Sequence, residues 1–240
     1  MDYTYLQTNL KRTREAYEAA AKSAGYDPAS ITLMAAIKSA EVEEINYLHR
    51  TLGVHYVGEN RVQQLLERYD RLDREGLHIH FIGSLQTNKV KYIIDKVELI
   101  QSLDSEHLAR EIERQAAKIG RVMDVLIEIN SGEEAAKGGV APADTAAFAE
   151  LLTGGDFPHI RLCGFMTMAP RSTEEAYHIY FADTRRLCES IWAQLQASGR
   201  IPAEERMVLS MGMSESFIPA AAEGATMLRV GRRLFQKEGS

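Results

Sequence analysis

Residues 31–52 read ITLMAAIKSAEVEEINYLHRTL, and this stretch holds one strand pattern followed directly by one helix pattern. The run 31–38 is apolar and of strand length, as expected for a strand buried on both faces of a parallel sheet. From residue 41 onward the apolar residues recur at intervals of three and four, which is typical of an amphipathic helix. The stretch therefore predicts one strand-helix unit, with Lys38 at the carboxyl end of the strand.

The same unit recurs along the chain of 240 residues. The predicted strands are 31–38, 55–60, 78–83, 98–104, 124–130, 161–168, 207–213 and 226–235. The helical segments between them include 41–52, 61–72, 105–120, 143–154 and 172–199. Eight strands joined by helices predict an α/β protein, a single (β/α)8 TIM barrel, because that class typically takes about 250 residues. An open doubly wound sheet is the alternative topology.

The remaining features fit one soluble domain over residues 1–240. Residues 4–24 have apolar positions at helical spacing and predict an N-terminal leading helix. The net charge of -6 argues against nucleic acid or an anionic membrane as partner. No run approaches the ~18 apolar residues of a membrane helix, and no signal core is evident, so we expect a cytoplasmic protein. We also expect a monomer, because no long apolar edge is evident.

Three groups that often mark chemistry have simpler interpretations here. Cys163 and Cys188 lack Cys-x-x-Cys spacing and a nearby histidine pair, so we expect two free buried thiols. His78 and His80 share a strand face, but no third metal ligand is evident. Ser105 precedes a helix pattern and fits a helix N-cap.

Lys38 is the first candidate for chemistry, because functional groups of a TIM barrel lie at the carboxyl ends of the strands. Met34, Ala36 and Lys38 share one strand face, and Lys38 lies at the barrel mouth if that face points inward. A partly desolvated lysine there is a nucleophile that forms a Schiff base with an aldehyde. A lysine that simply reaches into solvent is the other interpretation, and position alone does not decide between them.

The other end of the chain offers a phosphate site. The segments 209–217 and 228–235 supply two glycines and two hydroxyls, those of Gly212, Gly231, Ser210 and Ser214. Glycines let backbone N–H groups approach an anion, and the loops after strands seven and eight are the recurring phosphate site of this fold. Because a barrel closes strand eight onto strand one, this cradle and Lys38 are neighbours. A phosphate ligand that carries an aldehyde fits both.

Arg229 precedes Gly231 by two residues and shares its strand face, so it points into the same mouth if that face is inward. An arginine beside the pyridine nitrogen of pyridoxal phosphate keeps that nitrogen unprotonated, which weakens the ring as an electron sink. Such a site suits a protein that holds the cofactor. A salt bridge at the barrel rim is the alternative role for Arg229.

Seven motifs occur in order after the strand-one lysine. They are GENRVQ (58–63), HFIGSLQTNK (80–89), SLDS (102–105), INSGEEAAKGGV (129–140), GFMTM (164–168), LSMGMS (209–214) and RVG (229–231). With Lys38, this set resembles the YggS/PROSC family of pyridoxal phosphate homeostasis proteins over nearly the whole chain. The resemblance implies a barrel similar to the N-terminal domain of alanine racemase, with pyridoxal 5'-phosphate held as an aldimine on Lys38.

The resemblance also implies a set of cofactor contacts. Ser210 and Gly231 would lie at the phosphate, Arg229 at the ring nitrogen and Asn60 close to the cofactor. The full predicted set is Lys38, Asn60, His80, Met166, Ser210, Met211, Gly212, Arg229, Gly231 and Arg232. Of these, the histidine and the two methionines would line the site less directly.

Two residues depart from the family pattern. Ile37 stands where the family usually has serine, and Arg232 stands where it usually has a threonine or serine that bonds the phosphate. The hydroxyl contact is therefore missing at residue 232. Its backbone N–H remains available, and its guanidinium can itself bind phosphate.

The function implied by the resemblance is to carry or buffer pyridoxal phosphate in vitamin B6 homeostasis without catalysis, and to supply apo-enzymes. The first alternative is an amino-acid racemase, which needs a second acid-base group opposite the lysine. Tyr56 and Tyr92 are the sequence candidates for that group. The second alternative is an aldolase-like barrel, which explains Lys38 and the phosphate cradle but not the ordered motifs.

Overall fold

The structure of the protein, a computed structural model, describes residues 2–132 and 138–237. Eight parallel strands pair in chain order, and the last pairs with the first to close the barrel. The strands are β1 (Thr32–Ala36), β2 (Tyr56–Glu59), β3 (His78–Phe81), β4 (Leu99–Leu103), β5 (Met123–Ile129), β6 (Ile160–Thr167), β7 (Val208–Ser210) and β8 (Met227–Val230). The predicted (β/α)8 barrel is confirmed. The middle of the motif at 129–140 lies outside the described residues.

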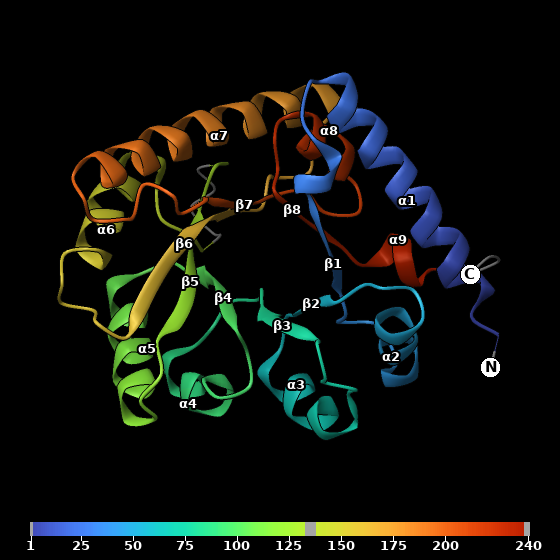
Figure 1. The fold of residues 1–240 in the computed structure, drawn as a ribbon, viewed down its shortest axis with the longest axis horizontal. Coiled ribbons are helices and arrows are strands. Elements are labelled where there is room, and N and C mark those ends of the chain that lie inside the picture. The colour runs from blue at the N-terminus through green and yellow to red at the C-terminus, as the bar shows by residue number, and fades with distance from the viewer. Residues whose placement is uncertain (1, 133–137, 238–240) are drawn as a thin grey trace.

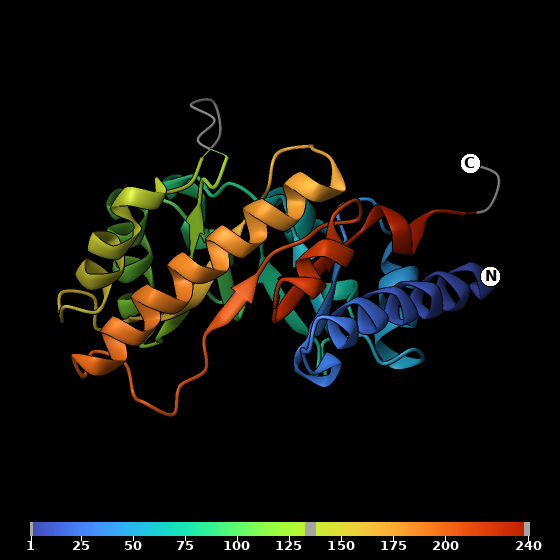
Figure 2. The same ribbon diagram turned by 90° about the horizontal axis from the view of Figure 1, so that it is seen from above.

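Helices surround the ring of strands (Figure 1). They are α1 (Thr4–Ser23), α2 (Val42–Arg50), α3 (Val62–Arg68), α4 (Val90–Ile93), α5 (Glu106–Lys118), α6 (Thr145–Leu152), α7 (Glu174–Ala197), α8 (Phe217–Ala222) and α9 (Arg232–Phe235). The predicted leading helix is confirmed as α1, which runs beside α8 and α9 (Figure 2). Asn9 on α1 donates to the carbonyl oxygens of Leu234 (3.0 Å) and Gln236 (2.9 Å). The two ends of the chain therefore meet beside the closing strands.

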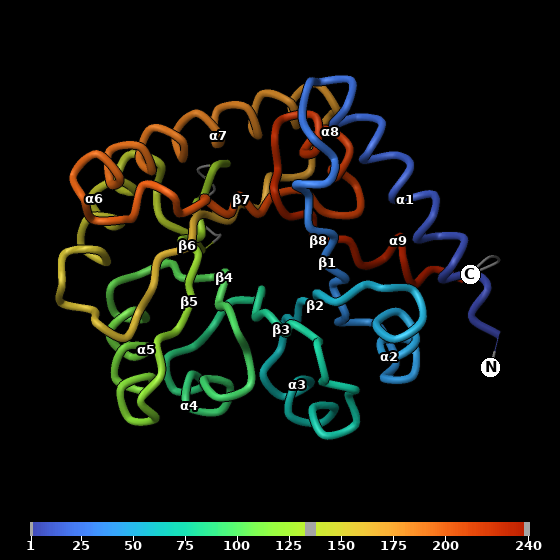
Figure 3. Tube along the Cα trace, viewed as in Figure 1, coloured from blue at the N-terminus to red at the C-terminus, as the bar shows by residue number. Residues whose placement is uncertain are grey.

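Alternation along β1 sorts its side chains into two layers. Leu33, Ala35 and Ile37 are buried in the layer between strands and helices. Met34 points inward and belongs with Met227 to a cluster inside the barrel. The Met34 face is thus the inward face, and β1 lies next to β8 along the whole seam (Figure 3). Ile37 is a core residue that points away from the barrel mouth.

Several predicted strands are too long at their carboxyl ends, and the last one differs most. The strand predicted over 226–235 ends at Val230, and Arg232–Phe235 form the short helix α9. The backbone N–H of Leu234 donates to the carbonyl oxygen of Gly231 at 2.8 Å, so the chain turns as soon as the strand ends. An apolar run of this length carries no periodicity that separates a strand from a four-residue helix.

Three further features bear on the sequence predictions. Cys163 and Cys188 are free and buried, as predicted. Ser105 caps α5, as predicted, and its Oγ accepts the backbone N–H of Leu108 at 3.4 Å. Within the described part of the chain, no helix is both long enough and apolar enough to cross a membrane.

A glycine allows β6 to pair with β7. Gly164 has a φ of +146°, and a Cβ there would lie 2.0 Å from the carbonyl oxygen of Val208. Gly164 is paired with Val208 in the sheet, so this approach is the strand contact itself. The register between β5 and β6 also shifts beside this glycine.

We expect Gly164→Ala to lower the free energy of unfolding by about 2–5 kcal/mol. The added methyl group must push β7 away, and the positive φ of residue 164 already disfavours a side chain. Gly155→Ala is the matched control. Gly155 also has a positive φ, +102°, but nothing lies within 4 Å of the added Cβ. The control should lose only about 1–2 kcal/mol. Urea unfolding of both variants measures the difference, and equal losses would refute the role of the strand contact.

Candidate functional site

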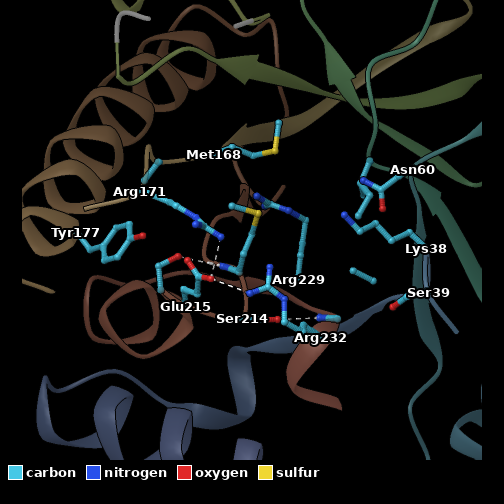
Figure 4. A pocket seen from close by; sticks show the side chains of 16 residues that line it. Lys38, Ser39, Asn60, Met168, Arg171, Tyr177, Ser214, Glu215, Arg229 and Arg232 are labelled. Carbon is cyan, nitrogen blue, oxygen red and sulfur yellow. Dashed lines mark hydrogen bonds and ion pairs between the residues drawn. The ribbon is translucent and has the colours of Figure 1, made fainter. Parts of the chain in front are cut away.

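A cavity of about 460 Å³ opens at the carboxyl ends of the barrel strands (Figure 4). Its size lies within the roughly 300–1,000 Å³ of small-molecule sites. Five of the ten predicted site residues line it, namely Lys38, Asn60, Arg229, Gly231 and Arg232. Five others do not, namely His80, Met166, Ser210, Met211 and Gly212. The closing seam thus brings the lysine after β1 and the turn after β8 into one cavity.

Lys38 presents an exposed amine to the cavity. Its side chain extends toward the centre, near Asn60 (Figure 4). Within residues 2–132 and 138–237, its ammonium group makes no ion pair or hydrogen bond. The partial burial predicted for this lysine is wrong, because the turn after β1 carries the side chain beyond the packed interior. The amine is available to a ligand.

Ser214 supplies a hydroxyl at the opposite end of the cavity. Its Oγ accepts the backbone N–H groups of Gly231 (3.2 Å) and Arg233 (3.4 Å), which joins the loop after β7 to the turn after β8. Because both bonds use the oxygen as an acceptor, the O–H of Ser214 is left to donate to a ligand. Gly231 must lack a side chain, since a Cβ there would lie 2.7 Å from the carbonyl oxygen of Ala36.

Two arginines at this end share one carboxylate. Glu215 Oε1 lies 2.9 Å from Arg232 Nη1 and 3.3 Å from Arg171 Nη2, and all three side chains line the cavity (Figure 4). All three are also exposed, so each ion pair contributes little to stability. The guanidinium of Arg232, predicted for phosphate, is therefore held by a weak contact that an anion can replace.

Arg229 is the buried cation of the cavity, with only 3% of its surface exposed. Its Nη1 donates to Ser210 Oγ at 2.7 Å, and its Nη2 donates to the carbonyl oxygen of Thr167 at 2.8 Å. Burial lowers the pKa of Arg229 to about 10, and the carboxylate of Glu128 opposes that shift. A group with this pKa is still charged at neutral pH, so the cavity carries a fixed positive charge.

Ser210 extends this contact into a hydrogen-bond chain inside the barrel. Its Oγ donates to Gln101 Oε1 at 2.7 Å, and Gln101 Nε2 lies 3.1 Å from His80 Nδ1. Burial lowers the pKa of His80 to about 3, so its neutral ring can accept from the amide. Because a guanidinium can only donate, every bond in the chain has one direction, and the chain orients Arg229.

The other predicted residues that miss the cavity are parts of the core. Met166 lies in the barrel interior, and Met211 lies in the layer beneath the helices. Gly212 has a φ of +87°, and a Cβ there would lie 2.5 Å from the Cβ of Ala220 on α8, so this glycine serves a tight turn. Roles for these residues toward a ligand stay predictions.

Several lining residues were missed by the sequence reasoning. Arg171, Tyr177 and Glu215 line the cavity, and no motif marks them. Met168 also lines it and is the last residue of the quoted motif GFMTM, whereas Ser214, which lines it as well, was predicted as a hydroxyl of the phosphate site. Position at the end of a motif was therefore the available signal for Met168.

The tyrosines named for racemase chemistry lie elsewhere. Tyr56 stacks on His78 with 4.5 Å between ring centroids, and Tyr92 lines a neighbouring cleft. Tyr177 lines the cavity instead, and its hydroxyl accepts the backbone N–H of Ser172 at 3.3 Å. Neither sequence candidate is placed to act as a second acid-base group.

No metal site is evident among the residues with described positions. No three His, Cys, Asp or Glu side chains in that part of the chain gather as ligands. His78 instead contacts Glu98 at 2.6 Å.

A buried carboxyl group lies near Arg229. Glu128 is 7% exposed, and its burial, with the carboxylate of Asp104 nearby, raises the pKa of Glu128 to about 7 against the attraction of Arg229. The ordinary value is 4.5. Because the folded state raises this pKa, the stability it contributes is full below pH 4.5 and is lost as the pH rises through 7.

The free energy of unfolding of the wild type should fall between pH 5 and pH 8 as Glu128 ionises. In Glu128→Gln this fall should be smaller, by on the order of 2–3 kcal/mol. Urea titrations across this range measure the slope. Glu150→Gln, at an exposed carboxyl on α6, is the control and should keep the wild-type slope. An unchanged slope in Glu128→Gln would contradict the raised pKa.

Similar proteins identify the family. The family model for the N-terminal domain of alanine racemase matches residues 6–238. The pyridoxal phosphate homeostasis protein of Aquifex aeolicus is 40% identical over 227 residues, which is 94% of this chain and 95% of the relative. That of Pseudomonas aeruginosa is 32% identical over 228 residues, covering 95% and 93%.

Solved structures agree with this relationship. A structure described as an unknown protein from Bifidobacterium adolescentis is 30% identical, with a TM-score of 0.88 over 98% of this chain and 97% of that one. PipY of Synechococcus elongatus PCC7942, with PLP bound, is 29% identical, with a TM-score of 0.75 over 92% and 99%. Alanine racemase of Clostridium difficile, at 18% identity, shares the fold. The chain belongs to the alanine racemase N-terminal domain family, and among its members to the pyridoxal phosphate homeostasis proteins.

Proposed function

We propose that this protein binds pyridoxal 5'-phosphate and carries or buffers it in vitamin B6 homeostasis. The observation that carries the proposal is the cavity itself, where a lysine amine that has no partner in the described part of the chain converges with a buried arginine and the Ser214 hydroxyl. The names of the relatives and the PLP-bound PipY structure support the same ligand.

The residues of the cavity fit each part of this cofactor. Lys38 would hold the aldehyde carbon through a Schiff base, because its amine has no competing partner among the described residues. Ser214 and the backbone N–H of Arg232 would hold the phosphate, since the Ser214 O–H can donate and Arg232, as the first residue of α9, has an N–H without a partner inside its helix. When bound, the cofactor would supply an electrophilic aldehyde and an aromatic ring.

Arg229 would face the ring nitrogen as a permanent donor. Its orientation is set by Ser210 and Thr167, so it offers a charge that does not accept a proton from the ring. A ring whose nitrogen stays unprotonated stabilises a carbanion poorly. This favours storage of the cofactor over turnover of amino acids, in agreement with relatives that are named homeostasis proteins.

The phosphate contact predicted for Ser210 is better assigned to Ser214. Ser210 is fully buried, and its single O–H proton is used in the bond to Gln101. Ser214 lines the cavity and keeps a proton to donate. We therefore assign Ser210 to the orientation of Arg229 and Ser214 to the phosphate.

Delivery of the cofactor to apo-enzymes, by a cytoplasmic monomer, completes the proposal. The cavity opens at a barrel face rather than inside the packed interior, so a bound cofactor would be reachable from outside. The aldolase-like reading is less well supported, because the relatives that match the whole chain are named for pyridoxal phosphate.

Borohydride reduction of the cofactor-loaded protein should fix the cofactor on Lys38, which peptide mass spectrometry locates. Lys38→Ala should abolish this label and change the melting temperature little, because the replaced side chain is exposed. Lys89→Ala, at an exposed lysine of the neighbouring cleft, is the control and should keep the label. Label on another lysine would refute the assignment.

Amino-acid racemisation by the loaded wild type above the rate of free cofactor would refute the storage role.

Ser214→Ala should weaken binding of pyridoxal 5'-phosphate by about tenfold while binding of pyridoxal, which lacks the phosphate, stays the same. Ser210→Ala should instead lower stability and leave the ratio of the two affinities unchanged, because its hydroxyl is used inside the barrel. Equilibrium titrations with both ligands measure this ratio. If the affinity for pyridoxal 5'-phosphate relative to pyridoxal falls in Ser210→Ala and not in Ser214→Ala, the phosphate contact belongs to Ser210, as predicted from the sequence.

A further inference from the structure

The direction of the Lys38 side chain depends on its backbone. The ammonium group makes no ion pair or hydrogen bond with any residue of 2–132 or 138–237, so no side-chain contact aims it. Residues 38 and 39 form a turn, in which the backbone N–H of Ala40 donates to the carbonyl oxygen of Ile37 at 3.0 Å. Whatever holds this turn therefore determines where the amine points.

Helix α3 holds the turn through two side chains. Arg68 Nη1 donates to the carbonyl oxygen of Ile37 at 2.8 Å, and Gln64 Nε2 donates to that of Lys38 at 3.4 Å. Gln64 and Arg68 are four residues apart and so lie on one face of α3. One helix face thus holds the two carbonyl groups on either side of the Lys38 amide nitrogen and Cα.

Glu59 links this clamp to the other wall of the cavity. Its Oε2 lies 3.3 Å from Arg68 Nη1, and its Oε1 accepts the backbone N–H groups of Asn60 (2.7 Å) and Arg61 (3.1 Å). Asn60 is also confined from its other side, because a Cβ on Gly83 would lie 2.1 Å from the Asn60 carbonyl oxygen. One carboxylate therefore fixes Asn60 directly and Lys38 through the arginine.

Burial of the Glu59–Arg68 ion pair costs free energy of desolvation, so the pair is poorly suited to stabilising the fold. The side chain of Glu59 is fully buried and that of Arg68 is 12% exposed. Glu59 Oε2 has no hydrogen-bond partner among the described atoms, and burial raises the pKa of Glu59 against the pull of Arg68 and the two amides. Apolar side chains in place of a buried ion pair often stabilise a protein. A charged pair that contacts the Ile37 carbonyl oxygen, directly before Lys38, and the backbone N–H of Asn60 is better explained by the residues that it positions.

We propose that Glu59, Arg68 and Gln64 are positioning residues that aim the Lys38 amine at the carbonyl carbon of a ligand in the cavity. The proposal rests on the proposed function, in which that ligand is pyridoxal 5'-phosphate. None of the three touches the ligand, since none of them lines the cavity. Their effect is on the geometry of the bond to Lys38, whereas the phosphate end, built on Ser214 and Gly231, is independent of them.

The test separates covalent attachment from total binding. Glu59→Gln and Arg68→Met are saturated with pyridoxal 5'-phosphate, total bound cofactor is measured, and the fraction fixed on Lys38 by borohydride is read by peptide mass spectrometry. We expect the covalent fraction to fall about tenfold, because small misplacements of a reacting group cost a large factor. Total binding through the phosphate should persist. The absorbance band of the attached cofactor should weaken in parallel, and Arg68→Lys, which keeps the charge, should recover part of it.

The matched control is the Asp124 and Arg161 pair at the amino ends of β5 and β6, where two hydrogen bonds of 2.8 and 2.6 Å join the side chains. Asp124→Asn should leave the covalent fraction at the wild-type value. A wild-type fraction in Glu59→Gln and Arg68→Met overturns the proposal. An equal fall in the control also overturns it, because the effect would then reflect general loss of structure.

Two further outcomes are distinguishable. If Glu59→Gln or Arg68→Met does not fold, Arg68→Lys and Gln64→Ala carry the test, and wild-type covalent fractions in both overturn the proposal. If the wild type itself fixes no cofactor on Lys38, the proposed function fails, and the positioning role fails with it. Failure of the positioning role alone leaves wild-type attachment intact.

Discussion

Parallel pairing of β8 with β1 is the interaction on which the site depends. The register sets Met34 opposite Arg229, so the two strands end at the same level. The residues that follow them, far apart in the sequence, then line one cavity. Gly231 makes the final approach possible, because its backbone passes too close to the carbonyl oxygen of Ala36 for any side chain.

The barrel interior holds a group of buried polar side chains among its apolar ones, where a TIM barrel usually packs apolar layers. Ser210, Gln101 and His80 are buried, and each would cost free energy if left without a partner. Their hydrogen-bond chain offsets that cost, and it also fixes the orientation of the Arg229 guanidinium at the edge of the cavity. The core therefore takes part in the chemistry of the site as well as in the stability of the fold.

The fold could be predicted because strands buried on both faces leave long apolar runs, and eight such runs separated by amphipathic segments admit few topologies. The site was harder, because it depends on turns. Ser210 and Ser214 are both hydroxyls of one motif, and the turn at Gly212 decides which of them faces the cavity. Arg171 and Tyr177 reach the cavity from the segment after β6, and no pattern in the sequence encodes that approach. Arg229 was predictable because strand alternation turns it inward, and Lys38 was predictable because it follows the carboxyl end of β1.

The helix contact at the two chain ends has a consequence for the order of events during synthesis. Asn9 on α1 bonds to carbonyl groups of Leu234 and Gln236, which are synthesised 225 and 227 residues later. The first strand must wait for the eighth before the turn at Gly231 can line the cavity beside Lys38. The end of the cavity built on Ser214 and Gly231 therefore forms only after all eight strands have been made.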